Sequence, residues 1–296
     1  AAAANTATNT LTSTGFTVLG KEGSAAATVT AGASAKTLAA AVNTDTTSTG
    51  VKAVANTAIR ISLTGDPAGQ TTMTLQGGGS AISISASVTS ATDLTALLSA
   101  INTYAGTTGV TAEFNGSDKS KLILREADGD DIKIQNFTAT TAAPAAVTAA
   151  VEKQTNFAGD AFTTGVTLTS AGTNSTIATG VVRLSSTAAF TTSAGTATTG
   201  YQGSATGQAS SLSRVSDVSV TTRANAESAL GVIDAALAKV NESRGALGAY
   251  SNRLDSTVSN LTNVAIQLEG GKGRIEDADF AAESTSLAKS QILQQA

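Results

Sequence analysis

The feature that most constrains the fold is a regular hydrophobic spacing near the C-terminal end of the sequence. From residue 230 to residue 268, positions separated by alternating steps of three and four residues follow one another without a slip. This 3.5-residue period predicts a helix whose narrow apolar stripe packs on another long helix. Nine of these positions hold large apolar residues, which we call the seam: Leu230, Ile233, Leu237, Val240, Leu247, Leu254, Val258, Leu261 and Leu268.

The seam requires a covering partner. Burying each of its side chains would contribute roughly 1.5–3 kcal/mol, and residues 1–211 show no pattern for a second helix of comparable length. We therefore expect a partner helix from outside this sequence; an ordinary amphipathic helix lying on the preceding region is the alternative. Arg244 and Ser251 interrupt the stripe, where they either fix the register of a helix pair or are simply tolerated near a helix surface.

Composition excludes several classes of function. The 296-residue chain has no Cys or His and a formal charge of −4, so histidine-based catalysis, thiolate chemistry and histidine-ligated metals are absent. We predict no enzyme activity and no cofactor. The charge gives no basic patch for nucleic acid, no apolar run is long enough to span a membrane, and Ala1–Thr10 lack the features of a secretory signal.

The chain divides into two regions of different character. Residues 212–296 are rich in charged residues and poor in glycine, whereas residues 1–211 carry most of the glycines. The change falls in a Thr/Gly/Ser/Ala stretch at residues 191–208, which is typical of a linker. Before it, alternating apolar and polar residues predict strands at 59–63, 73–75, 81–85, 121–126 and 132–136, with turns at 66–67, 77–79 and 128–129.

An internal repeat lies inside the first region. Residues 28–53 align without gaps on residues 87–112. In this alignment Asn43 corresponds to Asn102, and Gly50-Val51 corresponds to Gly109-Val110. Each copy predicts a strand, an amphipathic helix, a turn and a returning strand. Two such units are expected to pack on a shared sheet; a chance match in an Ala/Thr-rich sequence is the alternative.

The C-terminal region predicts two helices. The first covers residues 212–269, and glycines at 270, 271 and 273 are expected to break it, because each costs roughly 1 kcal/mol in a helix interior. Asp277 or Asp279 then caps a second helix over residues 274–296. The predicted fold class is α+β: a β-rich outer region at 1–205 with short helices and two repeats, a long coiled-coil-like helix, and a second terminal helix.

Two polar clusters are candidate sites, each with a simpler alternative. Asp128, Asp130 and Asp131 could hold a hard cation through oxygen ligands, or form a hairpin turn; the sequence leaves this open. Lys119, Lys121 and Arg125 could bind an acidic polymer, or form a solvated face.

Four sequence blocks in the C-terminal region resemble the C-terminal core of bacterial flagellin, the subunit of the flagellar filament. They are AESALGVIDAAL (226–237), NRLDSTVSNL (252–261), RIEDADFAAE (274–283) and SQILQQA (290–296). The two repeats resemble the short insert motif of flagellin and hook-associated outer domains. The resemblance implies an extracellular subunit that polymerises for motility, with the outer region projecting from the filament.

The resemblance also implies partners. Other flagellin subunits and the N-terminal helices of the same protein, which we expect to lie outside this sequence, would cover the seam. An export chaperone and the innate immune receptor for flagellin are further expected partners, with Asn252, Arg253 and Asp255 as receptor-facing residues. The alternative function is a flagellin-like cell-surface protein whose outer region binds a ligand such as an anionic polysaccharide.

Overall fold

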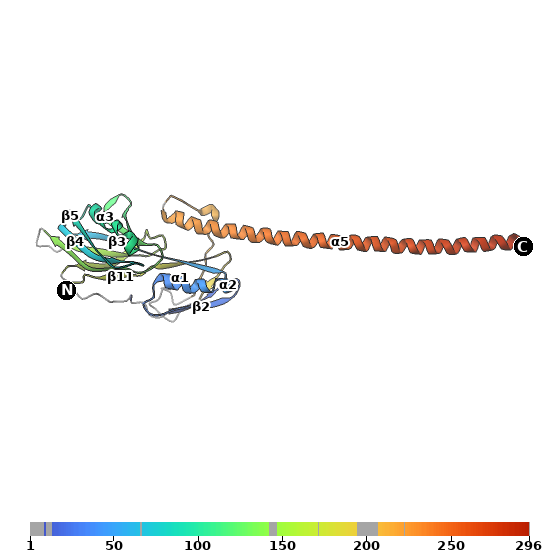
Figure 1. Ribbon diagram of the computed structural model, residues 1–296, viewed down its shortest axis with the longest axis horizontal. Coiled ribbons are helices and arrows are strands. Elements are labelled where there is room, and N and C mark those ends of the chain that lie inside the picture. Colours follow the sequence, from blue (N-terminus) through green and yellow to red (C-terminus); the bar gives the residue numbers. More distant parts are fainter. Residues whose placement is uncertain are drawn as a thin grey trace. The chain divides into compact units, whose positions relative to one another are not determined.

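A computed structural model describes residues 9, 14–65, 67–141, 147–170, 172–193, 207–221 and 223–295. Strands and short helices form the first part of the chain, and a long helix forms the last part (Figure 1). The chain divides into two compact units, residues 1–236 and residues 237–296, each with its own internal contacts. The predicted α+β class is confirmed.

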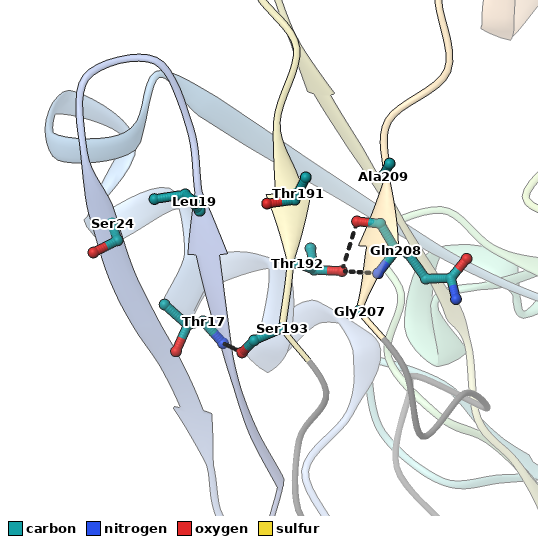
Figure 2. A pocket seen from close by; sticks show the side chains of 9 residues that line it. All are labelled: Thr17, Leu19, Ser24, Thr191, Thr192, Ser193, Gly207, Gln208 and Ala209. Atoms are coloured by element: carbon teal, nitrogen blue, oxygen red, sulfur yellow. Dashed lines mark hydrogen bonds between the residues drawn. The ribbon is translucent and has the colours of Figure 1, made fainter.

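The first of three sheets has the strand order β14-β13-β1-β2. Its strands are β1 (Thr14–Leu19), β2 (Ser24–Val29), β13 (Thr191–Thr192) and β14 (Gln208–Ala209). Side chains reinforce its short strands: the Thr17 amide donates to Ser193 Oγ at 3.0 Å, and Thr192 Oγ1 bonds to the backbone of Gln208 (Figure 2). Residues more than 160 positions apart therefore meet in one sheet.

The second sheet has the order β10-β9-β3-β7-β6, and a further strand, β12, pairs with β3. Its strands are β3 (Val51–Thr64), β6 (Val110–Asn115), β7 (Asp118–Glu126), β9 (Thr148–Gln154), β10 (Phe162–Thr169) and β12 (Val181–Ser186). The third sheet has the order β11-β8-β4-β5. It consists of β4 (Pro67–Gln76), β5 (Ile82–Val88), β8 (Ile132–Thr141) and β11 (Thr176–Ala178). All five predicted strand segments lie in or overlap these strands.

The helices of the first unit are short. They are α1 (Ala35–Thr44), α2 (Thr46–Thr49), α3 (Thr95–Thr103), α4 (Ala105–Thr108) and the 3₁₀ turn η1 (Val215–Asp217). None of them is long enough to cover the seam along its whole length. Each aligned segment of the repeat thus contains the predicted strand, helix and returning strand, and a second, four-residue helix lies where the sequence predicts a turn.

An asparagine closes each copy of the repeat. Asn43 at the end of α1 donates from Nδ2 to the Ala53 carbonyl at 2.9 Å, and its Oδ1 accepts from the Ala53 amide at 2.8 Å. Asn102 makes the same two bonds to Ala112 at 2.9 and 2.8 Å. The amide side chain thereby substitutes for a neighbouring strand and fastens the helix to the returning strand.

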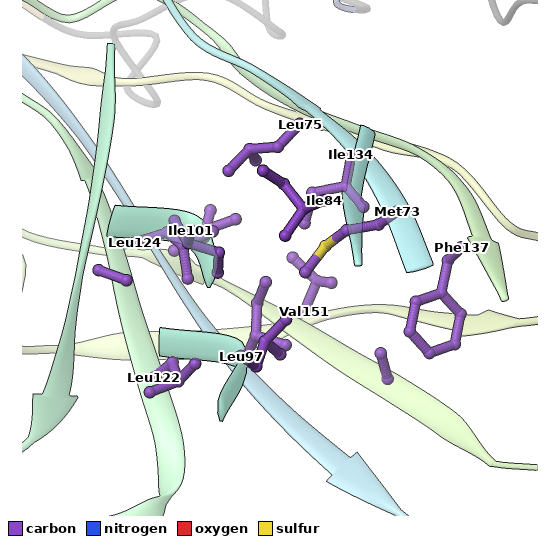
Figure 3. Close-up of a cluster of buried hydrophobic side chains, with 14 of the residues drawn as sticks. Met73, Leu75, Ile84, Leu97, Ile101, Leu122, Leu124, Ile134, Phe137 and Val151 are labelled. Carbon is purple, nitrogen blue, oxygen red and sulfur yellow. The ribbon is translucent and has the colours of Figure 1, made fainter. Parts of the chain in front are cut away.

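Two separate apolar cores fill the β-rich body. The larger core lies between the second and third sheets under α3, where Leu97 and Ile101 point inward with strand residues such as Leu75 and Leu124 (Figure 3). The smaller core lies under α1, where Leu38 and Val42 take the equivalent places. The four-residue spacing of these helix residues puts each pair on one helix face, which explains why both are buried.

The C-terminal region differs from its predicted form in two respects. The first predicted helix was to begin at residue 212, but residues 212–221 contain only the 3₁₀ turn η1, and α5 (Arg223–Gln295, 73 residues) begins later. The same helix runs through Gly270, Gly271 and Gly273 without the expected break. Glycine cost alone does not stop a helix that is already nucleated on both sides, because propagation adds a hydrogen bond per residue. An i,i+4 pair of Lys272 with Glu276 at 3.6 Å crosses the same stretch. Asp277 and Asp279 therefore lie within the helix instead of capping a new one.

The predicted linker lies largely outside the described residues, since residues 194–206 belong to the part that is not described. Asp66 of one predicted turn is also outside them, whereas the turns at 77–79 and 128–129 connect β4 to β5 and β7 to β8.

Candidate assembly surface

The seam lies on α5 with its apolar side chains in solvent. All nine seam residues are between 46% and 69% exposed, in contrast to the core leucines and isoleucines of the body, which are almost fully buried. Leaving so long an apolar stripe in contact with water is unfavourable, because the free energy falls when apolar surface is removed from water. The surface therefore has the properties of a contact surface for another helix.

Polar residues border the seam. Arg244 and Ser251 are exposed at seam positions, and the receptor-facing candidates Asn252, Arg253 and Asp255 are exposed on the same stretch of helix. In preceding turns of α5, Lys239 pairs with Glu242 at 2.9 Å. The side chains of Asn252, Arg253 and Asp255 are therefore accessible on α5.

The first turns of α5 pack on the β-rich body through residues that the sequence did not single out. Ala229 is 4% exposed. Arg183 of β12 donates from Nη1 to Ser228 Oγ at 3.2 Å, and its guanidinium lies 4.4 Å from the centre of the Phe157 ring. A Cβ at Gly231 would lie 3.2 Å from Arg183 Nη2, so a residue without a side chain leaves room for the arginine.

The acidic loop after β7, which the sequence offered as a candidate site for a metal cation, binds the ammonium group of Lys36 instead. Lys36 Nζ donates to Asp130 at 2.8 Å and to Asp128 at 3.3 Å, and hydrogen bonding to Asp130 raises the pKa of Lys36. Among the described residues, no group of acidic side chains has the arrangement of a metal site. The loop is therefore held against the start of α1 by ion pairs with the Lys36 ammonium group.

Two carboxyl groups beside this loop are buried. Burial raises the pKa of Glu126, even though its Oε2 accepts a hydrogen bond of 2.6 Å from the Asp130 amide. Burial also raises the pKa of Asp131, whose Oδ2 accepts from Asn9 Nδ2 at 2.7 Å. Both groups hold the loop in shape, and desolvation of their charged forms is the cause of both shifts.

The basic stretch is largely neutralised by its neighbours. Arg125 donates from Nε to Glu113 at 2.6 Å and from Nη2 to the Gly159 carbonyl at 2.9 Å. Lys121 lies 3.5 Å from Asp118. Because Arg125 and Lys121 already have carboxylate or carbonyl partners, these two cations give no support to binding of an acidic polymer.

An open pocket of about 540 Å³ lies on the first sheet (Figure 2). Residues of β1, β2, β13 and β14, among them Thr17, Leu19 and Ser24, line it with a mostly apolar surface, and no lining residue carries a charge. In the part of the chain that is described, no helix is long and apolar enough to span a membrane.

Two family models match the chain. The bacterial flagellin C-terminal helical region matches residues 230–296, which include the whole seam. The flagellin hook IN motif matches residues 72–128, which include the second copy of the repeat. The chain is therefore similar to the bacterial flagellin C-terminal helical region over residues 230–296 and to the flagellin hook IN motif over residues 72–128.

Similar proteins are flagellins. The chain is 34% identical over 269 residues to B-type flagellin of Pseudomonas aeruginosa, an alignment that covers 90% of this chain and 53% of that protein. It is 50% identical over 82 residues to flagellin A of Vibrio cholerae, covering 28% of this chain and 22% of the relative. The chain thus spans about half the length of the first relative and less of the second.

A solved structure of the D2–D3 domains of the Escherichia coli flagellar cap protein FliD is 12% identical and covers 46% of this chain and 95% of that one. Its TM-score of 0.19 is too low to carry an argument. The resemblance to bacterial flagellin that the four sequence blocks indicate is confirmed by the family and relative matches.

Proposed function

We propose that this chain is part of a structural subunit of the flagellar filament, which polymerises outside the cell through the seam of α5 and serves motility. The observation that carries the proposal is the exposed seam, which coincides with the matched flagellin helical region. The outer region, residues 1–205, would project from the filament, and the role is structural, not catalytic.

The energetics favour assembly through this surface. If assembly removed the exposed part of the nine seam side chains from water, the gain would be on the order of 10 kcal/mol before the entropic cost of association. The seam has alternating three- and four-residue steps, which is the geometry that lets side chains of one helix fit between those of another. Helices of a flagellin chain are therefore the proposed cover, both N-terminal helices of the same protein and neighbouring subunits.

The test compares this chain alone with the chain joined to the N-terminal helical segment of a flagellin. Alone, it should remain a monomer or form weak oligomers, and the α5 amides should exchange rapidly with solvent. With the added segment, light scattering should report long polymers and the α5 amides should become protected. Ordered filaments built by this chain alone would refute the need for added helices.

Asn252, Arg253 and Asp255 are proposed as part of a surface for the innate immune receptor for flagellin, and an export chaperone is a second proposed partner. The three side chains are exposed. Because a few central residues carry most of the energy of such interfaces, this chain should bind the receptor ectodomain more weakly than a full-length flagellin monomer. Equal affinities in a titration of the two proteins would contradict this.

A further inference from the structure

We infer that the outer region consists of two copies of one folding module, the second inserted into the first at a hairpin. The described residues of the first module are 14–56, 181–193 and 207–209, and the second module is inserted after residue 56 and ends before residue 181. The family match covers only the second copy, so the first is an additional IN-type module. The inference goes beyond the proposed function and does not depend on it.

The first half of each module has the same elements in the same order. β1, β2, α1, α2 and β3 of the first module correspond to β4, β5, α3, α4 and β6 of the second. The correspondence includes fine detail: Thr49 Oγ1 accepts from the Val51 amide at 3.2 Å as Thr108 Oγ1 does from the Val110 amide. The glycines that follow these two threonines both have positive φ, 70° and 78°.

The two copies diverge where one of them makes a hairpin. In the second module, Asn115 ends β6, Gly116 turns with a φ of 67°, and Asp118 pairs with Asn115 at the start of β7. The aligned residue in the first module, Asn56, is followed by Thr57. A β-branched residue avoids positive φ, so β3 continues straight for 14 residues and enters the second sheet.

The chain returns to the first module after the second is complete. Val181 of β12 pairs with Asn56, so the two ends of the insertion meet across one strand pair. β12, β13 and β14 then occupy the places that β7, β8 and β11 occupy in the second module. The first sheet, β14-β13-β1-β2, therefore has the same order of equivalent strands as the third sheet, β11-β8-β4-β5.

The cores divide at the same boundary. Every residue of the smaller core comes from residues 16–55 or, among its partly buried neighbours, from 182–190. Every residue of the larger core, with its neighbours, comes from residues 59–178. Since the two buried sets share no residue, each module has the separate core that independent folding requires.

The closing experiment removes residues 57–180 from the chain and joins Asn56 to Val181 through Gly-Ser, which reproduces the Asn-Gly-Ser turn of residues 115–117. Thermal unfolding followed by circular dichroism, with hydrogen exchange of the α1 amides, reports whether the first module persists. We expect cooperative unfolding and protected amides in α1. The melting temperature should be lower than that of the parent chain, because Lys36 loses its partners Asp128 and Asp130.

Two matched controls also lack Asp128 and Asp130, the partners of Lys36, and differ from the first variant only in how β3 is linked to β12. Joining through Thr-Ala, the residues that naturally follow Asn56, should lower the melting temperature relative to Gly-Ser, because threonine resists the turn conformation. Joining Ala55 to Val181 through Gly-Ser slips the strand pair by one residue and should abolish cooperative unfolding. Loss of cooperativity with the matched Asn56 joint, or equal behaviour of the matched and slipped joints, would overturn the inference.

A second variant tests the same inference in the full chain. The hairpin at Gly116 is equivalent to the insertion point, and a Cβ there would meet no atom within 4 Å. A ten-residue peptide tag between Gly116 and Ser117 should leave the melting temperature within a few degrees and be accessible to an antibody. The same tag between Gly50 and the buried Val51 should destabilise the first module; equal destabilisation by the two tags would refute the equivalence.

Discussion

Replacing the asparagine that closes a module should destabilise that module far more than its exposed position indicates. Asn102 is a suitable test because its partner Ala112, in the strand that returns from α4, is only 8% exposed. Asn102→Ala removes a donor and an acceptor at once. The Ala112 amide and carbonyl then lose their partners at 2.8 and 2.9 Å.

The expected cost follows from those two backbone groups. A typical hydrogen bond contributes about 1 kcal/mol net, but a buried group left without a partner costs about 1–3 kcal/mol. With some access of water at this partly buried site, we expect the free energy of unfolding to fall by about 2–3 kcal/mol. Asn102→Asp keeps the acceptor and loses the donor, so at neutral pH a carboxylate faces the Ala112 carbonyl and the variant should also be destabilised.

The assay is urea unfolding with hydrogen exchange of the β6 amides as a local measure. Thr103→Ala is the matched control, because it removes only an exposed hydroxyl bond to the Ser99 carbonyl, and it should change the free energy by less than about 0.5 kcal/mol. Asn43→Ala should act in the same way on the first module. A change for Asn102→Ala as small as that for Thr103→Ala would refute the role of Asn102 in fastening α3 to β6.

Three further changes test other parts of the fold. Burial raises the pKa of Glu126 above its ordinary value of about 4.5, so the contribution of this group to folding stability is fully present below that value and is lost as pH rises through the raised pKa. The free energy of unfolding of Glu126→Gln should therefore increase relative to that of the parent as pH rises, and equal differences between the two proteins in urea unfolding at pH 4 and pH 7 would contradict this. Gly129→Ala should lower the free energy of unfolding by more than Gly116→Ala, because both have positive φ but only the first would bring a Cβ within 2.3 Å of Ala55; similar losses for the two would count against the packing argument. Gly271→Ala should slow amide exchange in the adjoining turns of α5 by adding roughly 1 kcal/mol of helix propensity, and unchanged exchange would show that glycine does not weaken the helix there.

The sequence predicts those parts of the structure that depend on periodic apolar residues. The seam indicated a long helix because its spacing persists over many turns, and alternating residues located all five strand segments. The repeat predicted the strand–helix–strand order because the aligned Leu and Val or Ile residues fix which helix face is buried. These signals are local, so a single sequence contains them.

The structural features that the sequence does not predict depend on contacts between residues distant in sequence. Nothing near Arg183 indicates that it meets Phe157 and Ser228, and nothing near Lys36 indicates the partners Asp128 and Asp130. The insertion was hidden because β12 belongs with β3, across more than a hundred residues. The expected helix break failed for another reason: glycine propensity is weak beside the cooperativity of long flanking helices.

The central claim, that the seam of α5 is the assembly contact, is tested most directly by a matched set of charge substitutions. In a flagellin chain that contains both this sequence and the N-terminal helices, Leu247→Asp and Leu261→Asp place a charge in the proposed contact, whereas Ser256→Asp places one on the opposite helix face by the heptad spacing. Filament yield is measured by electron microscopy and light scattering at equal monomer concentration. We predict loss of filaments for both leucine variants and parental yield for Ser256→Asp; parental yield from the leucine variants would contradict the account.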